Sequence, residues 1–230
     1  MKIRVVSYNI RHGHDVGLDM SLIAADILSV GADVVGLQEV DVETSRVHGR
    51  DTLSELAHAL GWEHYRFCRA IDFAGGGYGT AVLSRFPIVS FGQTHFDVPT
   101  PIEGRAVGHA VIDAHGERVD FFNTHLSYES DELRAGQFAA LADLVAKYPA
   151  WVLTGDFNTA DLAHFDVLET ATLANPNRYP TFPASGEGID NIVCNAPWRI
   201  TDTGVLQNHH SDHVLLWADL QKISCERSTP

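Results

Sequence analysis

The sequence contains few cysteines, and the three it has, Cys68, Cys194 and Cys225, follow no paired spacing. An odd number of isolated cysteines predicts free thiols rather than a disulfide framework. The chain also lacks an apolar run of the roughly 18 residues that a membrane helix needs. Its N-terminus enters strand-like sequence directly, without the basic and apolar regions of a secretory signal. Together these absences predict a cytoplasmic protein.

Basic residues are also scarce, with 16 Lys and Arg against 30 Asp and Glu and a net charge of -14. Proteins that hold long nucleic acids by the phosphate backbone use a surface rich in Lys and Arg. No basic run provides such a surface here, so extended nucleic acid is a disfavoured partner. Hydrophobic content of 45% over 230 residues is typical of one globular domain. The composition sets no oligomeric state.

Several motifs of other hydrolases are absent. The chain has no His-Glu-x-x-His helix and no paired cysteines, which disfavours a zinc hydrolase. It also lacks the Gly-Asn-His cluster and early Asp-x-His of calcineurin-type phosphoesterases. The glycine-rich segment 75–79 is followed by a predicted strand and lacks the Gly-Lys-Ser/Thr ending of a P-loop. We therefore interpret this segment as a surface turn before the strand.

Alternating and continuous apolar runs predict a chain of mixed strands and helices. Strands are expected at 2–10, 33–38, 79–84, 87–91, 105–113, 117–125, 150–155, 190–194 and 213–220, and helices at 20–30, 53–60 and 131–147. Because strands and helices do not alternate strictly, the pattern favours an α+β layered sandwich over a doubly wound parallel sheet. We expect one catalytic domain at 1–222, a tail at 223–230 and a long loop at 172–188.

Six short polar clusters lie beside these apolar runs, where polar side chains are costly to bury unless they are paired or hold a metal. They are Ser7-Tyr8-Asn9, Gln38-Glu39, Asn123-Thr124-His125, Gly155-Asp156-Phe157-Asn158, Ile189-Asp190-Asn191 and Ser211-Asp212-His213. Their shared oxygen and imidazole chemistry indicates a single site. The chemistry that such a site supports is metal-assisted hydrolysis of a phosphoester.

The cluster Gly155-Asp156-Phe157-Asn158 is the strongest single signal. Asp156 and Asn158 are two residues apart and point the same way after a strand. A carboxylate that takes a proton from water, beside an amide that donates to a phosphoryl oxygen, suits in-line attack. The alternative is an Asx-type helix start, and the two interpretations are compatible.

Other candidate residues divide into metal ligands and phosphate contacts. The metal ligands are Asn9, Glu39 and Asp212, whose hard oxygen donors suit Mg²⁺, Mn²⁺ or Ca²⁺ rather than zinc. Alternatively, Asn9 is a turn residue that hydrogen-bonds its own backbone, and Glu39 caps a helix or forms a salt bridge. Asp190 is a candidate to orient a histidine. Arg105 is either a phosphate clamp or a partner in a surface salt bridge.

In this order the clusters make the chain resemble the endonuclease/exonuclease/phosphatase superfamily of metal-dependent phosphoesterases, from residue 3 to about 218. The residues that match are Ser-Tyr-Asn at 7–9, Gln-Glu at 38–39, Gly-Thr-Ala-Val-Leu-Ser-Arg-Phe-Pro at 79–87, Asn-Thr-His-Leu at 123–126, Gly-Asp-Phe-Asn at 155–158, Ile-Asp-Asn-Ile at 189–192 and Ser-Asp-His at 211–213. The resemblance implies a four-layer α/β/β/α sandwich with the site at one edge of both sheets.

The resemblance also implies the roles of the site residues. Asn9 and Glu39 would bind Mg²⁺ or Mn²⁺, with Asp212 nearby or contributing. Asp156 would deprotonate the water and Asn158 would support the transition state. The phosphoryl oxygens would be contacted by two histidines, and Asp190 would orient the second of them. These histidines are His125 and His213.

Two departures from the superfamily bear on the substrate. Arg11 stands where abasic-site nucleases carry an acidic residue, and Thr80 stands where many relatives have Asn. Small, often bacterial members that begin Ser-Tyr-Asn-Ile-Arg-His-Gly fit the chain better. Our leading hypothesis is a hydrolase of a small phosphodiester or phosphomonoester, such as a lipid head group. The alternatives are an endonuclease or exonuclease on DNA or RNA and, in another class, a non-catalytic binding protein on the same fold.

Overall fold

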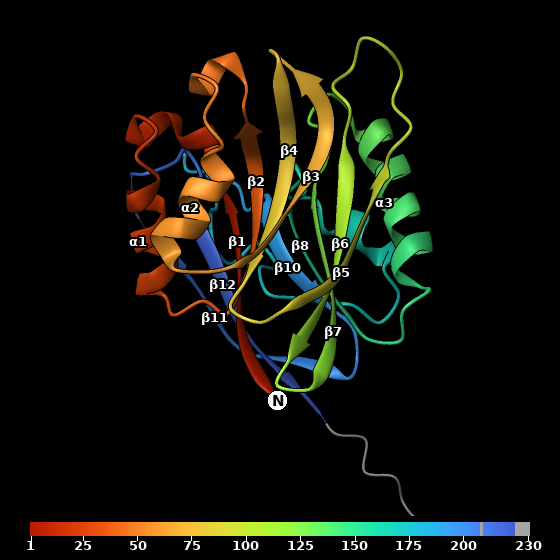
Figure 1. Ribbon diagram of the computed structural model, residues 1–230. Coiled ribbons are helices and arrows are strands. Elements are labelled where there is room, and N and C mark those ends of the chain that lie inside the picture. The colour runs from red at the N-terminus through yellow and green to blue at the C-terminus, as the bar shows by residue number, and fades with distance from the viewer. Residues whose placement is uncertain (208, 224–230) are drawn as a thin grey trace, which may run out of the picture.

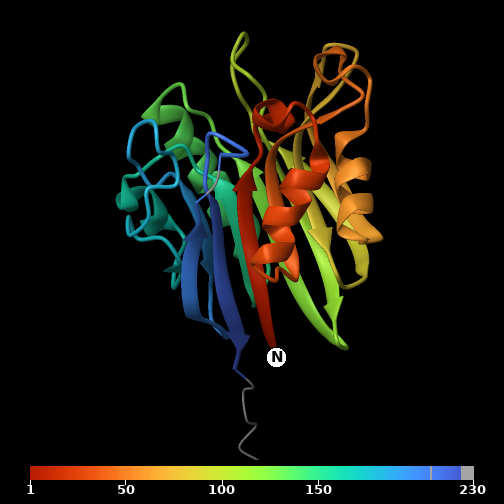
Figure 2. The ribbon, with the colours of Figure 1, turned by 90° about the vertical axis from the view of Figure 1, so that its left-hand side faces the viewer.

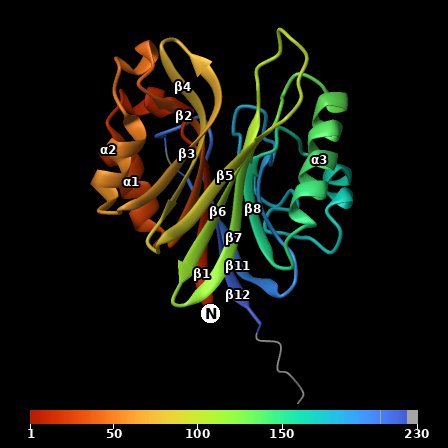
Figure 3. The same cartoon turned by 45° about the vertical axis from the view of Figure 1, so that its right-hand side comes forward.

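The computed structural model describes residues 1–207 and 209–223, which form two sheets packed face to face with helices on both outer faces (Figure 3). Helices α1 and α2 cover one sheet and α3 covers the other (Figure 1). The α-helices are α1 (Met20–Ser29), α2 (Thr52–Leu60) and α3 (Asp131–Val145), and the 3₁₀ helices are η1 (Arg11–Val16), η2 (Ser45–Val47) and η3 (Leu162–Val167). This arrangement confirms the predicted four-layer α/β/β/α sandwich.

The first sheet has six strands and carries the N-terminus of the chain. In spatial order they are β11 (Trp198–Leu206), β12 (Leu215–Lys222), β1 (Lys2–Asn9), β2 (Val34–Val42), β4 (Gly76–Ser84) and β3 (His64–Phe73). The second sheet has the order β5 (Ile88–His95), β6 (Ala106–Ala114), β7 (Glu117–His125), β8 (Trp151–Asp156), β10 (Asp190–Cys194) and β9 (Thr172–Leu173). Both sheets are mixed, since β1 pairs parallel with β2 and β7 pairs parallel with β8.

The apolar residues divide into three clusters that hold the four layers together. Alternate residues of β1 face opposite ways, so Val5 packs between the sheets while Val6 packs against α1 and α2. Figure 2 shows these two helices lying over the outer face of the first sheet. On the second sheet, Phe121 faces the first sheet and Phe122 faces α3. Burial of apolar surface in all three clusters is the main force that fixes the distance between the layers.

Three edge strands escaped the sequence patterns. Strands β3 and β11 lie at opposite edges of the first sheet, and much of their surface is exposed or half-buried. The two-residue strand β9, at an edge of the second sheet, lies in the segment 172–188 that was predicted to be a loop. An edge strand has one paired neighbour, so it does not require the apolar run that marks a buried strand. The glycine-rich segment was also interpreted wrongly in part, since Gly76 and Gly77 belong to β4. Only the residues just before them form the turn.

The topology brings the polar clusters to one edge of the sandwich. Strands β1 and β2 run parallel, and so do β7 and β8, so their carboxyl ends meet there. Strands β12 and β10 run antiparallel to β1 and β8, which places their amino ends at the same edge. Residues that end one strand and residues that begin another therefore face a common space.

A buried polar contact fixes the two sheets to each other beneath this edge. Gln38 of β2 donates from Nε2 to Asn123 Oδ1 of β7 at 2.7 Å, and the Thr154 hydroxyl donates to the same oxygen at 2.9 Å. The backbone of β2 approaches so closely that a Cβ on Gly36 would lie 2.1 Å from Thr154 Oγ1. Glycine is therefore required at this position for the sheets to meet.

Candidate active site

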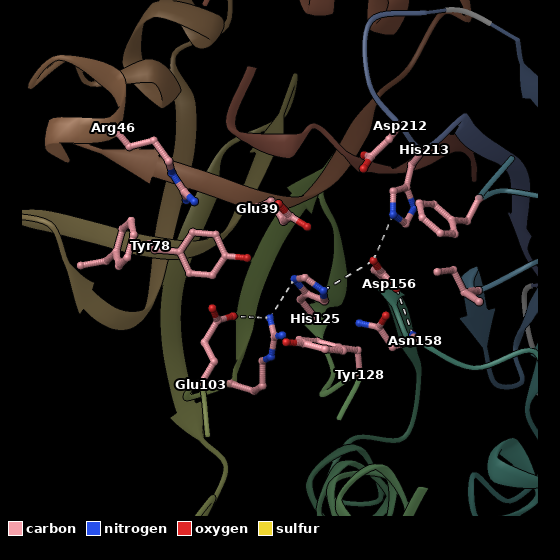
Figure 4. A pocket seen from close by; sticks show the side chains of 14 residues that line it. Glu39, Arg46, Tyr78, Glu103, His125, Tyr128, Asp156, Asn158, Asp212 and His213 are labelled. Carbon is pink, nitrogen blue, oxygen red and sulfur yellow. Dashed lines mark hydrogen bonds and ion pairs between the residues drawn. The ribbon is translucent and has the colours of Figure 1, made fainter. Parts of the chain in front are cut away.

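The polar clusters surround a cavity of about 510 Å³ at this edge of the sandwich (Figure 4). Seven of the predicted site residues line it: Glu39, Arg105, His125, Asp156, Asn158, Asp212 and His213. The other two, Asn9 and Asp190, are buried behind the lining with 0% and 1% of their surface exposed. The structure thus brings together all nine residues that the sequence singled out.

Asp156 lies at the centre of the cluster, at the end of β8. Its Oδ2 accepts a hydrogen bond from Asn9 Nδ2 at 3.0 Å and lies 3.5 Å from the Nε2 atoms of both His125 and His213. Burial and the nearby Asp190 carboxylate raise the pKa of Asp156 to about 7, against the opposing effects of His213 and Asn9. A carboxyl group with a pKa near neutrality can gain and lose a proton during turnover.

His213 is held between two carboxylates. Its Nδ1 lies 2.8 Å from Asp190 Oδ2, while its Nε2 faces Asp156 and the ring of Phe182 packs against it at 4.9 Å. Burial alone would lower the pKa of His213, but Asp190 and Asp156 outweigh this effect and raise it to about 10. The imidazole therefore carries a positive charge at neutral pH. His213 precedes β12, which begins at Leu215 rather than at the predicted residue 213, and Asp212 lines the same cavity.

The second histidine, His125, is neutral rather than positively charged. His125 Nδ1 lies 3.1 Å from Arg105 Nη1, and a guanidinium can only donate, so this ring nitrogen accepts the hydrogen bond. The proton of the neutral ring is therefore on Nε2, which faces Asp156. Burial, together with the charge of Arg105, holds the pKa of His125 well below its usual range. Arg105 itself is 3% exposed, lines the cavity and also pairs with Glu103 at 2.8 Å.

Glu39 reaches the cavity from a bulge in β2. The pairing of β2 with β4 shifts register between Leu37 and Val40, and Glu39 has a φ of 55°. Bulges commonly redirect a side chain beside an active site. Burial would raise the pKa of Glu39, but contact with His12, the nearby histidines and Asn9 lower it to about 2. A charged carboxylate is therefore directed at the cavity.

Asn9 and Arg11 connect the remaining acidic residues. Asn9 Nδ2 donates to Glu39 Oε1 at 3.1 Å as well as to Asp156, and its Oδ1 accepts the backbone N–H of Arg11 at 3.0 Å. The Arg11 guanidinium lies 3.5 Å from Asp212 Oδ2. The residue that departs from the nuclease pattern thus partly neutralises one predicted metal ligand.

The donor set fits a hard divalent cation. Glu39 is ionised and lines the same cavity as Asp212, and carboxylate oxygens are ligands that Mg²⁺ and Mn²⁺ prefer. The Asn9 amide directs its nitrogen to Glu39, while its oxygen accepts the Arg11 backbone N–H. Ligand atoms of Asp156, Asp190 and His213 also lie within 4.8 Å of one another among the described residues. In that group both ring nitrogens of His213 already face carboxylates, which suits a protonated imidazole better than a metal-bound one.

Asn158 both forms the Asx turn and directs its side chain into the cavity. Its backbone N–H donates to Asp156 Oδ1 at 3.0 Å, which is the Asx turn, and its φ is 52°. Its side chain lines the cavity, and Nδ2 donates to the Leu126 carbonyl at 2.8 Å. An amide nitrogen has two hydrogens, and within residues 1–207 and 209–223 Nδ2 has no second acceptor, so one N–H of Asn158 is available for a ligand.

Part of the long loop 172–188 is tied firmly to the site. The Asn175 side chain accepts from the Tyr179 backbone N–H and donates to the carbonyls of Tyr179 and Asp190. The Thr181 hydroxyl accepts the backbone N–H of Asp190 at 3.0 Å. These bonds hold the segment that carries Phe182 against His213, where Phe182 forms part of the cavity wall.

Sequence reasoning missed six residues that line the cavity. Phe73 is on β3, a strand that the apolar pattern did not mark. The other five are Arg46, Tyr78, Glu103, Tyr128 and Phe182. Four of them lie on connections or short helices between the predicted elements, where no apolar period marks a position. The fifth, Tyr78, is within the glycine-rich segment, which was the one available signal.

The comparisons with known proteins agree with this architecture. The model of the Endonuclease/Exonuclease/phosphatase family matches residues 6–213. A family structure from Beutenbergia cavernae is 24% identical with a TM-score of 0.80, covering 96% of this chain and 72% of that one. The mannosyl-6-phosphatase Bt3783 of Bacteroides thetaiotaomicron is 19% identical (TM-score 0.73, coverage 95% and 99%). Humanized D. rerio TDP2 is 16% identical (TM-score 0.74, coverage 96% and 99%). A comparison with curated proteins gives no match.

The fold is thus an α+β sandwich with carboxylate and histidine residues at one edge of both sheets. The chain belongs to the endonuclease/exonuclease/phosphatase family. Members of this family are hydrolytic enzymes that include phosphatases and nucleases, and they typically use divalent metals. In the described part of the chain, no helix is long and apolar enough to span a membrane.

Proposed function

We propose that the chain hydrolyses a phosphoester bond in a small substrate, a phosphodiester or phosphomonoester, with Mg²⁺ or Mn²⁺ bound. The observation that carries this proposal is the convergence of three N–H-bearing side chains on Asp156 Oδ2, at the wall of an open cavity. That geometry combines a proton acceptor with donors for the oxygens of a phosphoryl group.

The residues of the chain divide the chemistry between them. Asp156, as a carboxylate, accepts the proton of the attacking water. His213, charged through its contact with Asp190, and His125, through its Nε2 proton, donate hydrogen bonds to the phosphoryl oxygens. The free amide N–H of Asn158 adds another donor beside Asp156. Donors held in place by buried partners stabilise developing charge without reorganising.

The divalent ion would be held by Glu39, with Asn9 and Asp212 contributing oxygen atoms. When bound it acts as a Lewis acid that stabilises negative charge on the phosphate and the leaving oxygen. The role of Arg105 as a direct phosphate clamp stays a prediction. Its contacts support a second role, in which it fixes the proton of His125 on Nε2.

Hydrolysis of p-nitrophenyl phosphate and bis-p-nitrophenyl phosphate, with Mg²⁺, Mn²⁺ or chelator, tests the proposal. We expect metal-dependent turnover by the wild type and a loss of about 10²–10⁴-fold in Asp156→Asn, because the general base is removed. Asp72→Asn is the matched control, since this carboxylate is exposed and pairs with Arg69 outside the cavity. Equal residual rates in wild type and Asp156→Asn would contradict the proposal.

A further inference from the structure

The half of the cavity away from His213 contains an arginine that the proposed chemistry leaves without a role. Arg46 lines this half together with Tyr78 and Glu103, while Glu39 and His125 lie between them and Asp156 (Figure 4). The Arg46 side chain is 34% exposed. It is therefore accessible to a molecule whose phosphate sits among the histidines.

Several neighbouring side chains orient the Arg46 guanidinium. Asp41, a fully buried carboxylate, accepts from Arg46 Nε at 2.9 Å and from Nη2 at 2.7 Å, and the Thr44 hydroxyl donates to the same carboxylate at 2.6 Å. The guanidinium also lies over the rings of Phe73 and Tyr78, at 4.7 and 5.3 Å from their centroids. Among the described residues no hydrogen-bond partner faces Nη1, so its two hydrogens remain available.

The glycine-rich segment makes this arrangement possible. A Cβ on Gly76 would lie 2.3 Å from the Val42 carbonyl oxygen and 2.5 Å from the Thr44 backbone nitrogen. The start of β4 can therefore pack against the turn that precedes Arg46 only with glycine at this position. The segment thus places Tyr78 next to the guanidinium.

The charges in this half of the cavity are balanced. Arg46 is paired with Asp41, and Arg105 is paired with Glu103. Glu39, between the two halves, is an ionised carboxylate. No cation of the lining is left in excess, so a second phosphate or carboxylate on the ligand would meet no uncompensated positive charge. An uncharged group that both donates and accepts hydrogen bonds fits this half better.

The remaining wall offers an aromatic face. Tyr128 lines the cavity and is 67% exposed, although its backbone carbonyl is held by Arg134 at 3.0 Å. The uncovered ring provides apolar surface in the same cavity as the N–H donors of Arg46 and the carboxylate acceptor of Glu103. A ligand ring with several hydroxyl groups requires this combination of groups. Its faces are apolar, and the hydroxyl groups at its edge both donate and accept hydrogen bonds.

We infer that Arg46, Glu103 and Tyr128 form a subsite for an uncharged, polyhydroxylated leaving group, so that the substrate is a phosphate ester of a sugar-like ring. The inference rests on the proposed phosphoesterase function and names its substrate class. Asp41 acts as a positioning residue, because it orients Arg46 without reaching the cavity lining.

The test compares three substrates in phosphate-release assays: glucose 6-phosphate, fructose 1,6-bisphosphate and p-nitrophenyl phosphate. We expect the wild type to favour glucose 6-phosphate in kcat/KM by at least about 10-fold over each of the others. In Arg46→Met the ratio of kcat/KM for glucose 6-phosphate to that for p-nitrophenyl phosphate should fall by about 10-fold or more, mainly through KM. Tyr128→Ala should lower the same ratio, and it removes little packing because the ring is exposed.

Arg50→Met is the matched control, because Arg50 makes a similar pair with Glu55 but does not line the cavity. Its ratio should equal that of the wild type. Preference of the wild type for the bisphosphate, or unchanged ratios in both Arg46→Met and Tyr128→Ala, would overturn the inference.

A binding measurement separates this inference from the proposed function. Calorimetric titration of Asp156→Asn with glucose 6-phosphate should give a Kd that rises by about 10-fold or more when Arg46→Met is added. This result would support the subsite even if no phosphoester were hydrolysed by the wild type. Equal affinity in the single and double variants would refute it, whatever the turnover.

Discussion

At the scale of single residues, the site contains two buried histidines, of which His213 is positively charged and His125 is neutral. In the metal-free protein we expect His213 to remain protonated up to a pH of about 10, because Asp190 and Asp156 outweigh its burial. We expect His125 to stay neutral well below pH 6.5, with its proton on Nε2, because it is buried and Arg105 donates to Nδ1. Nitrogen-15 NMR of the imidazole rings over this pH range measures both states. Titration of both rings near pH 6.5 would contradict the assignment.

The His213–Asp190 pair also links stability to pH. A histidine whose pKa is raised on folding contributes stability that is fully present below its unfolded pKa of about 6.5 and is lost as pH rises through about 10. Asp190→Asn should therefore lower the free energy of unfolding by about 3–5 kcal/mol near pH 6, and by less at pH 9. Urea unfolding of the metal-free protein at both values tests this. A pH-independent difference would argue against a charged His213.

At the scale of elements, the contact between β2 and the second sheet determines how closely the two halves of the site meet. Gly36→Ala should lower the free energy of unfolding by about 1–3 kcal/mol, because the new Cβ would displace Thr154 and Asn123. Gly92→Ala on β5 is the matched control, since a Cβ there meets no atom within 4 Å. Thermal unfolding of the two variants should differ clearly in Tm. Equal values would show that the sheets can separate at little cost.

At the scale of the whole molecule, a bound divalent ion should stabilise the folded chain. Ligand at 100 times its Kd adds about 2.7 kcal/mol to the free energy of unfolding. We expect Mn²⁺ to raise the Tm of the wild type and to have little effect on Glu39→Gln, which loses the charged ligand. Glu63→Gln, at an exposed position, should respond as the wild type does. If Mn²⁺ raised the Tm of Glu39→Gln as much as that of the wild type, Glu39 would not be a metal ligand.

The overall charge makes a further prediction about substrates. With a net charge of -14, the molecule repels a polyanion except where local cations intervene. Cleavage of plasmid or single-stranded DNA should therefore be slow relative to hydrolysis of a small phosphoester at 0.15 M salt. Time courses on both substrates at equal enzyme concentration measure the ratio. Rapid, salt-sensitive DNA cleavage would favour the nuclease hypothesis instead.

Much of this architecture follows from local sequence. The central strands are apolar runs, and the polar residues that end them are costly to bury singly, so the grouping of Asn9, Asp156 and Asp190 could be anticipated. Of the three cysteines, Cys68 and Cys194 are free as predicted, and both are buried, whereas Cys225 lies outside the described residues. The predicted tail 223–230 also lies outside them, apart from Ile223.

Other features of the site depend on contacts between distant segments, and only the tertiary structure determines them. The bulge that directs Glu39 inward arises from the pairing of β2 with β4, and the charge states of His125 and His213 arise from partners at least 20 residues away. Edge strands and cavity walls, including Arg46, carry no apolar period because they bury little surface. The sequence by itself therefore determined the family, the layers and the polar residues that line the candidate site. Only the fold determined their protonation and the shape of the space they share, since both depend on burial and on distance through space.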